Sequence, residues 1–435
     1  MNHHMQKHHD SHPFSYLSLL IVMTCLMTCP DTLRAQRHEI LSDRIASLQV
    51  VANDDWMGLP IVTLNASDEW LTVSFDDLTH EYHRYTYRLE HCEANWTVSE
   101  GLFMSDYLEG FRDGLIIEDC QESLNMATLY THYTLTLPND GCRIKMSGNY
   151  RLTIIDDNNN GEEMLRAYFM VIEKKMSVSM EMLTNTDIDI NNSHQQIAMK
   201  LTYNSISVTD PERQLHTVVM QNRRWSTARC DAPWQYTTQD GLQWSHCRQL
   251  IFPAGNEYHK FEYLDLHRNS LGIDHTGFDG REYHAWVNTD EPRRNYIYDE
   301  DANGAFYIRN TDDYNNDTES EYVQIHFTYA APRVGGEPRP FDGEVYLNGQ
   351  FTNDFLLPQY RMEYDAVSGT YQCAVKLKMG YYSYQYLLLD RQGNTMLLPS
   401  EGSYYETENQ YDALIYYRPI GGRTDLLVGH ASIRR

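Results

Sequence analysis

Apolar and polar side chains alternate along most of this chain. In the segment 129–137, for example, Tyr133 lies between His132 and Thr134, and Leu135 lies between Thr134 and Thr136. A period of two residues is typical of a β-strand that buries one face. The pattern predicts a strand there and in further segments with the same period, at 71–75, 150–154, 165–171, 178–182 and 197–203.

Turn residues separate the predicted strands, and helical patterns are nearly absent. Clusters of Asp, Asn and Gly occur at 156–161, 299–304 and 390–394, and such clusters mark turns. The 33 tyrosines are concentrated in the alternating segments, where aromatic side chains suit a half-buried pleated surface. A short segment around 101–112 is the one candidate helix. The sequence therefore predicts an all-β protein.

The length of 435 residues indicates two or three domains. In immunoglobulin-like sandwiches, a tyrosine at the start of a late strand binds upstream backbone through its hydroxyl. This arrangement is called a tyrosine corner, and a glycine usually stands two positions before its tyrosine. Tyr150 and Tyr371 both follow a glycine at this spacing. We predict two or three immunoglobulin-like or early-set β-sandwiches in tandem, at 37–175, 176–335 and 336–435, with the Pro- and Gly-rich segment 331–340 as a linker.

Residues 1–36 form a predicted signal peptide and are set apart from the fold. Their apolar run at 14–27 is too short to span a bilayer as a stable anchor. Cleavage after Ala35 is expected, which leaves a soluble mature protein outside the cytoplasm. The alternative is a lipoprotein signal with an acylated Cys29, although Thr28 stands where such signals normally have Gly, Ala or Ser.

The chain is acidic, with a formal net charge of −26. Nucleic acid is not expected as a partner, because binding it requires a clustered basic surface. No polybasic run indicates attraction to anionic lipids, and we expect no direct membrane insertion. The charge leaves room for a protein partner with a basic surface. We expect a monomer.

Six cysteines follow the predicted leader. An oxidising compartment permits disulfides, but a chain of this length can build its cores without them. Cys230 and Cys247 flank a short loop and form the best local pair. The alternative is that most of the six are buried free thiols.

The motif HCEANW at 91–96 is the sharpest local candidate for a site. A cysteine nucleophile needs a nearby base, but neighbouring strand residues such as His91 and Cys92 point to opposite faces. The structural interpretation places Cys92 in the core, with Trp96 packed in the following loop. His132 either pairs with His91 across neighbouring strands or is hydrogen-bonded separately.

Asp299, Asp301, Asn303 and Gly304 match the first positions of a calcium-binding loop. Position twelve, where such loops need a bidentate carboxylate, is Asn310. A hairpin turn between strands explains the loop better, and we expect no metal and no cofactor. The sequence also lacks a GxSxG elbow, a phosphate loop and a dinucleotide fingerprint. The many carboxylates leave a glycosidase pair open, but the prediction is a non-enzymatic protein.

Several motifs resemble, in order and spacing, the type IX secretion system plug protein family. In the first domain they are FDDL at 75–78, HCEANW at 91–96 and YLEG at 107–110. The similarity continues almost to the C-terminus, at 130–140, 148–155, 218–225, 252–265, 377–386 and 408–419. Some residues of these motifs we expect to hold the fold together: His91, Cys92, Trp96, Tyr107, His132, Tyr150, Asn222, Asn256 and Glu257.

The resemblance implies a non-enzymatic periplasmic plug that occludes the periplasmic opening of an outer-membrane translocon barrel. The barrel protein is the implied partner, and the implied location is the periplasm at the outer membrane. The alternative is a glycan-binding module or surface lipoprotein of a polysaccharide-uptake system. It draws on the segment 343–355, which resembles the early-set sandwich of glycogen-binding modules, with Tyr382, Tyr384 and Tyr386 as sugar contacts. Those modules usually bind sugar with tryptophan, and no tryptophan follows Trp286.

Overall fold

The computed structural model describes residues 36–110, 114–311 and 315–434. The predicted leader up to residue 35, with Cys29, lies outside the described residues. Residues Gln36–Arg435 form one compact unit. Its described part consists almost entirely of strands and short turns, which confirms the predicted all-β class. In that part, no helix is long and apolar enough to cross a membrane.

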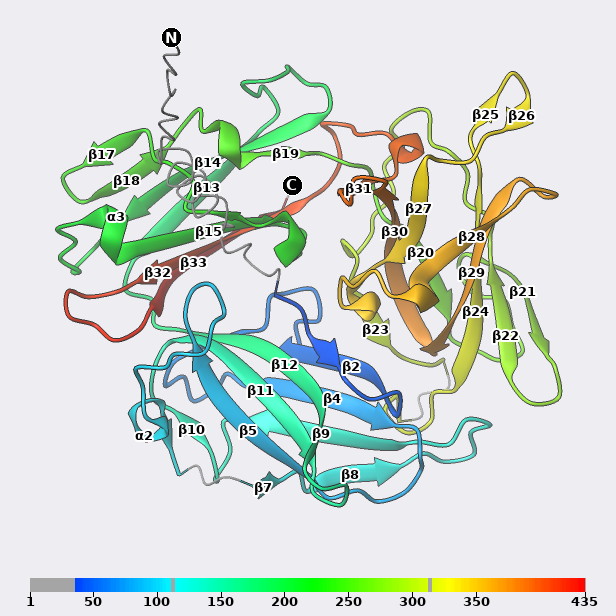
Figure 1. The fold of residues 1–435 in the computed structure, drawn as a ribbon, viewed down its shortest axis with the longest axis horizontal. Coiled ribbons are helices and arrows are strands. Elements are labelled where there is room, and N and C mark those ends of the chain that lie inside the picture. The colour runs from blue at the N-terminus through cyan, green and yellow to red at the C-terminus, as the bar shows by residue number, and fades with distance from the viewer. Residues whose placement is uncertain (1–35, 111–113, 312–314, 435) are drawn as a thin grey trace, which may run out of the picture. The chain divides into compact units, whose positions relative to one another are not determined.

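The first β-unit contains two sheets around one core (Figure 1). One sheet has the order β1-β12-β11-β5-β7, with β3 parallel to β12, and the other has the order β2-β4-β9-β8. Side chains from both sheets, including Phe75 and Leu152, form the core. The strands are β1 (Glu39–Ile40), β2 (Ile45–Ala52), β3 (Ile61–Thr63), β4 (Leu71–Asp77), β5 (Tyr85–Cys92), β7 (Leu115–Ile116), β8 (Asp119–Glu122), β9 (Thr131–Leu137), β11 (Gly148–Asp156) and β12 (Glu162–Ile172), with the small pair β6 (Leu108–Glu109) and β10 (Arg143–Ile144).

The second β-unit also contains two sheets, in the orders β13-β14-β18-β17 and β16-β15-β32-β33, with β19 paired to β14. Its core includes Ile197, Trp244 and Tyr411. The elements are β13 (Ser177–Leu183), β14 (His194–Thr202), α3 (Pro211–Gln214), β15 (Leu215–Gln221), η1 (Trp225–Thr227), β16 (Arg229–Cys230), β17 (Tyr236–Thr238), β18 (Gly241–Trp244), η2 (Arg248–Leu250), β19 (Ile251–Pro253), β32 (Gln410–Tyr417) and β33 (Leu426–Arg434).

The third β-unit is one sheet of ten strands that runs β20-β30-β27-β28-β29-β24-β22-β21, with β23 and β31 also paired to β30. Its core includes Phe261, Phe327 and Tyr384. The elements are β20 (His259–Tyr263), β21 (Ile273–Phe278), β22 (Tyr283–Val287), β23 (Phe306–Ile308), β24 (Tyr322–Ala330), β25 (Arg333–Val334), β26 (Glu337–Pro338), β27 (Gly343–Asn348), η3 (Gln350–Thr352), η4 (Pro358–Tyr360), β28 (Arg361–Asp365), β29 (Thr370–Lys378), β30 (Gly380–Asp390), β31 (Thr395–Leu397) and η5 (Pro399–Glu401).

Strand pairing crosses the predicted boundary between residues 335 and 336. β24 pairs with β29 along its whole length, and β32, near the C-terminus, pairs with β15 of the second β-unit. The predicted linker 331–340 instead contains the hairpin of β25 and β26. The prediction failed because a local two-residue period identifies strands but carries no information about their distant partners.

The hydroxyl of Tyr371 does bond upstream backbone, but 30 residues away, and the close corner of the third β-unit is formed by another tyrosine. The Tyr150 hydroxyl donates to the Met146 carbonyl, four residues upstream, at 2.7 Å. The matching bond in the third β-unit belongs to Tyr382, which donates to the Lys378 carbonyl at 2.6 Å and also follows a glycine by two positions. Tyr371 instead accepts a hydrogen bond from the Phe341 amide at 2.7 Å.

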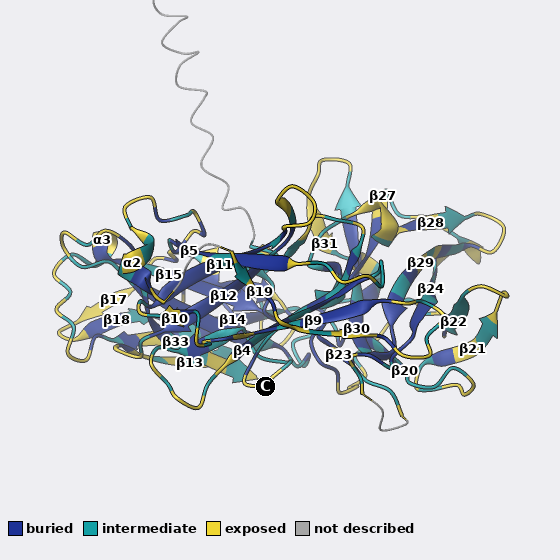
Figure 2. Ribbon diagram, turned by 90° about the horizontal axis from the view of Figure 1, so that it is seen from below, coloured by how far each residue is buried: buried dark blue, intermediate teal, exposed yellow. Residues whose placement is uncertain are grey.

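Burial follows the predicted alternation except where another β-unit covers a strand. Figure 2 shows dark blue and teal strands, with the yellow, exposed residues mainly in the loops. In β9 the core residue Tyr133 is buried, but His132 on the other face is buried as well. In β12 the outward residues Tyr168 and Met170 pack against strands of the second β-unit. The candidate helix around 101–112 is only α2 (Met104–Tyr107) in the described residues.

Candidate functional site

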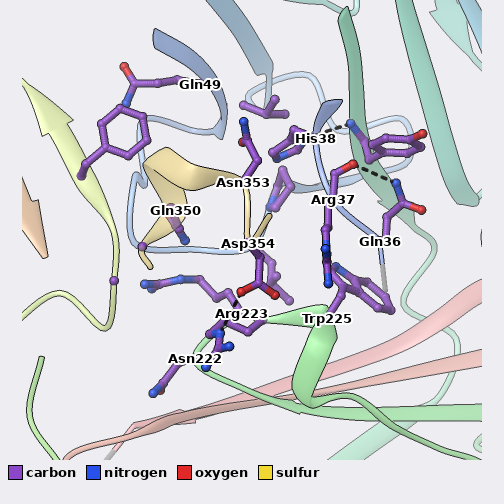
Figure 3. Close-up of a pocket in the computed structure, with 18 of the residues that line it drawn as sticks. Gln36, Arg37, His38, Gln49, Asn222, Arg223, Trp225, Gln350, Asn353 and Asp354 are labelled. Carbon is purple, nitrogen blue, oxygen red and sulfur yellow. Dashed lines mark hydrogen bonds and ion pairs between the residues drawn. The ribbon is translucent and has the colours of Figure 1, made fainter. Parts of the chain in front are cut away.

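A cavity of about 130 Å³ is lined by side chains of all three β-units (Figure 3). The first β-unit contributes β2, the loop residue Trp96 and the N-terminal residues 36–38. The second contributes the segment 222–225 after β15, and the third contributes residues between 348 and 354. Motifs that are far apart in the sequence therefore meet at one place.

Six non-glycine residues of the cavity lining have backbone in the left-handed region, and Trp96, Arg223 and Asp354 are among them. Trp96 has a φ of 67°, Arg223 of 59° and Asp354 of 58°. This conformation costs a residue with a side chain about 1–2 kcal/mol. Unlike Asp, neither Trp nor Arg has a short polar side chain that offsets this cost locally. Their contacts with the rest of the molecule therefore have to hold them in place.

Arg223 connects the three β-units through its guanidinium group. It donates to the main-chain carbonyls of Met57 in the first β-unit and of Ala302 and Asn303 in the third, at 2.7 and 3.0 Å for the last two. It also donates to the Gln410 side chain of the second β-unit at 3.2 Å. Burial lowers the pKa of Arg223. These bonds explain why a buried arginine is tolerated here.

The neighbouring Arg224 pairs with Asp354 across the cavity wall. Its Nε lies 3.3 Å from Asp354 Oδ1, which also accepts a hydrogen bond from Asn348 at 2.9 Å. Burial opposes the charge of both partners, but their attraction outweighs it. As a result, the pKa of Arg224 is raised and the pKa of Asp354 is lowered.

A second polar junction joins the first and third β-units. Asp76 in β4 and Lys378 in β29 form an ion pair of 2.7 Å, with side chains 0% and 1% exposed. Asp76 also accepts a hydrogen bond from Tyr322 at 2.6 Å and lies 2.6 Å from His132 Nδ1. Burial lowers the pKa of Lys378. Burial would raise the pKa of Asp76, but Lys378 and His132 outweigh it and the pKa is lowered.

A third junction joins the first and second β-units around His91. Its Nδ1 lies 2.9 Å from Ser99 Oγ and 3.3 Å from Thr424 Oγ1, and its Nε2 lies 3.2 Å from the Ser147 carbonyl. Close by, Arg418 pairs with both Glu93 and Asp425 at 2.8 Å. Burial lowers the pKa of His91. Both ring nitrogens of His91 therefore lie within hydrogen-bond distance of groups of the protein itself.

The remaining residues of the N-terminal motifs lie in apolar cores. Cys92 packs beside Trp96, whereas His91 lies against the Tyr150 ring on the other side of β5. Burial raises the pKa of Cys92 to about 12, so its thiol is not a nucleophile at neutral pH. Tyr107 is buried in the first core. His91 and His132 do not pair, because β5 and β9 belong to different sheets.

Asn256 and Glu257 connect the third β-unit to the segment before β32. Asn256 donates to the Glu401 carbonyl at 2.8 Å. The Glu257 carboxylate accepts hydrogen bonds from the Tyr296 hydroxyl at 2.6 Å and from the Glu408 amide at 3.1 Å. Burial raises the pKa of Glu257. Asn222 donates to Asn409 at 2.7 Å in the same region.

The loop 299–304 directs its carboxylates to protein donors. Asp299 pairs with Lys260 at 2.5 Å. Asp301 accepts from the Tyr258 and Asn303 amides, both at 2.5 Å, and burial raises its pKa to about 7. Among the described residues, no cluster of three or more His, Cys, Asp or Glu side chains is placed to hold a metal ion.

Two further expectations are wrong. Cys230 and Cys247 are both free thiols, so the best local pair is not bonded. Tyr382, Tyr384 and Tyr386, the expected sugar contacts, are at most 2% exposed. Their rings face the core of the third β-unit, and they offer no platform for a glycan.

Sequence reasoning missed Asp76, Lys378 and Arg223. On an isolated strand, a charged residue on the outer face is read as solvated, and nothing local shows that another β-unit covers it. For Arg223 a signal was available, because two consecutive arginines follow the buried strand β15 after a single asparagine.

Comparisons with known proteins identify the family. The model for the first domain of type 9 secretion system plug proteins matches residues 45–173. A crystal structure of a hypothetical protein from Parabacteroides merdae is 34% identical, with a TM-score of 0.86, and the match covers 92% of this chain and 99% of that one. An enterococcal surface protein is 8% identical, and the match covers 92% of this chain and 95% of that one, with a TM-score of 0.17. A collagen adhesin from S. aureus is 7% identical, and the match covers 91% of this chain and 95% of that one, with a TM-score of 0.11. Both TM-scores are too low to indicate a shared fold. No curated protein gives a significant match. The chain belongs to the type IX secretion system plug protein family.

Proposed function

We propose that this protein is a soluble plug that occludes the periplasmic opening of the outer-membrane translocon barrel of type IX secretion. The family match over residues 45–173 is the observation that carries the proposal. The barrel protein is then the partner, and the periplasm at the outer membrane is the location. The family is a secretion family and not a class of enzymes, so we assign the protein no reaction.

A plug must resist deformation, and the buried polar junctions between the β-units would make the molecule rigid. Arg223, the Asp76–Lys378 pair and the His91 cluster each connect two or more β-units. Buried polar networks of this kind favour one arrangement of the parts they join, because breaking their hydrogen bonds leaves buried groups unpaired. Such a body blocks a pore by occupying it.

A plug must also leave the pore when cargo passes. We therefore expect an interface of moderate polarity rather than an obligate hydrophobic one. The net charge of −26 favours a barrel mouth with basic groups, and association should weaken as salt concentration rises.

The test is deletion of the protein in its host. Uptake of a large antibiotic should rise and return to normal when the protein is restored. A strain that lacks both this protein and the barrel is the control, because an unplugged pore leaks only if the pore exists. The proposal fails if permeability does not rise and the protein never co-purifies with the barrel from detergent-solubilised envelopes.

A further inference from the structure

The cavity shared by the three β-units contains N–H groups without partners. Arg37 Nε, Trp96 Nε1 and Arg223 Nε are buried and make no hydrogen bond in the described part of the chain. All three residues line the cavity, and Trp96 and Arg223 are only 9% and 8% exposed. Buried donors nearly always have a partner in native proteins. Two buried acceptors of the lining, Asn303 Oδ1 and Asp354 Oδ2, also lack a partner, but the three unpartnered donors outnumber them and indicate a ligand with strong acceptor atoms.

The charges at the cavity favour an anion. Asp354 is the one carboxylate among the described residues of the lining; its Oδ1 is paired with Arg224, and its Oδ2 has no hydrogen-bond partner. Arg223 uses its other N–H groups on neutral carbonyl oxygens. Arg37 stands over the Phe355 ring, 5.0 Å from its centroid, without an ion pair to any described residue. Two guanidinium groups thus lack a carboxylate, which is their preferred partner.

The remaining wall is aromatic. Trp96 and Trp225 meet edge to face, with ring centroids 5.2 Å apart, and Tyr168 and Phe306 also contribute. A volume of about 130 Å³ is similar to that of an engineered cavity of about 150 Å³ that accepts benzene. The space therefore suits one aromatic ring or one branched aliphatic side chain.

We propose that this cavity binds a carboxylate attached to a compact apolar group. The carboxylate oxygens accept from Arg37, Arg223 and Trp96, and the apolar group lies against the aromatic wall. Two sources share this chemistry: the carboxy-terminal residue of a peptide and a small free carboxylic acid. The proposal concerns a ligand site and does not depend on the plug function.

The first test compares matched probes by calorimetric titration of the full chain. Benzoate should bind at least about tenfold more tightly than benzamide, which has the same shape without the charge, because a hydrogen bond to a charged acceptor is stronger than one to a neutral acceptor. N-acetyl-leucine should likewise bind better than N-acetyl-leucinamide if a peptide end is the source. Binding of benzoate without binding of N-acetyl-leucine assigns the site to a free acid.

Variants locate the binding. Trp96→Phe keeps an aromatic ring, though a smaller one, but removes the N–H donor, and Arg37→Gln removes a charge; each should weaken benzoate binding about tenfold or more. Arg84→Gln removes an equal charge at an exposed position whose partner is Asp157, and it should leave binding unchanged. Equal affinity for benzoate and benzamide, or no binding of either by the unaltered chain, overturns the proposal and means that water satisfies the donors.

Discussion

At the residue scale, the Asp76–Lys378 pair joins two β-units without contact to water. Removing one partner leaves the other charge buried and unpaired, which costs about 3–5 kcal/mol. We therefore expect Asp76→Ala to lower the free energy of unfolding by about this amount in urea titrations. Arg391→Gln is the control, because Arg391 pairs with Asp342 at an exposed position and such pairs contribute about 0–1 kcal/mol.

The double variant Asp76→Leu with Lys378→Met separates charge from packing. It leaves no unpaired charge, and buried ion pairs replaced by apolar side chains are often neutral or stabilising. The double variant should recover most of the stability lost in Asp76→Ala. If Asp76→Ala is no worse than Arg391→Gln, the pair does not join the units as described.

His259 in β20 makes stability depend on pH. It lies 2.8 Å from Asp290 and 2.9 Å from Glu401. Burial alone would lower the pKa of His259, but the two carboxylates outweigh it and raise the pKa to about 9. Because the pKa is near 6.5 in the unfolded chain, this stabilisation is fully present below about pH 6.5 and is lost as the pH rises through about 9. A shift of this size corresponds to about 3 kcal/mol.

Urea titrations between about pH 6 and pH 10 should show the loss. The unaltered protein should lose stability more steeply over this range than His259→Gln. His275→Gln, at an exposed position, should follow the unaltered protein. Parallel curves for all three proteins would show that His259 is not held in its charged form.

The candidate cavity was only partly predictable at this scale. The motifs drew attention to Trp96 and Asn222, which both line the cavity. Arg37, Arg223 and Asp354 could not be assigned to it, because each comes from a different β-unit and their proximity follows from strand pairing that local patterns do not encode.

At the scale of elements, the two tyrosine corners fix the start of β11 and of β30. Tyr150→Phe and Tyr382→Phe each remove the donor to a carbonyl four residues upstream. Each should cost about 1–3 kcal/mol, because a buried acceptor loses its partner. Tyr82→Phe, at a position that is 60% exposed, should change little. Thermal unfolding of the three variants measures the difference, and no loss in Tyr382→Phe would contradict the corner at that position.

The sequence was sufficient to identify strands and their buried faces, as in β9, but not their outer faces or partners. His132 and Asp76 are buried because the third β-unit covers them, although each lies on the face opposite to the first core. A period of two residues reports one buried face. It cannot report a second face that is covered by residues about 300 positions away.

At the scale of the whole molecule, the path of the chain predicts which fragments fold. The chain builds the third β-unit between β20 and η5 and then returns to the second β-unit with β32 and β33. A fragment of residues 256–404 keeps all strands of the third sheet and its whole core. It should unfold cooperatively on heating, as an independent domain does.

The fragment 336–435, which matches the domain expected from the sequence alone, should not fold. It lacks β24, which pairs with β29, and it separates β32 from β15. Its apolar strand faces and edges would be exposed, and such edges promote aggregation. Circular dichroism of the two fragments on heating distinguishes the two divisions of the chain. A cooperative transition in 336–435 and none in 256–404 would mean that the C-terminal strands belong with the third β-unit, and that their pairing with β15 contributes little to the stability of the molecule.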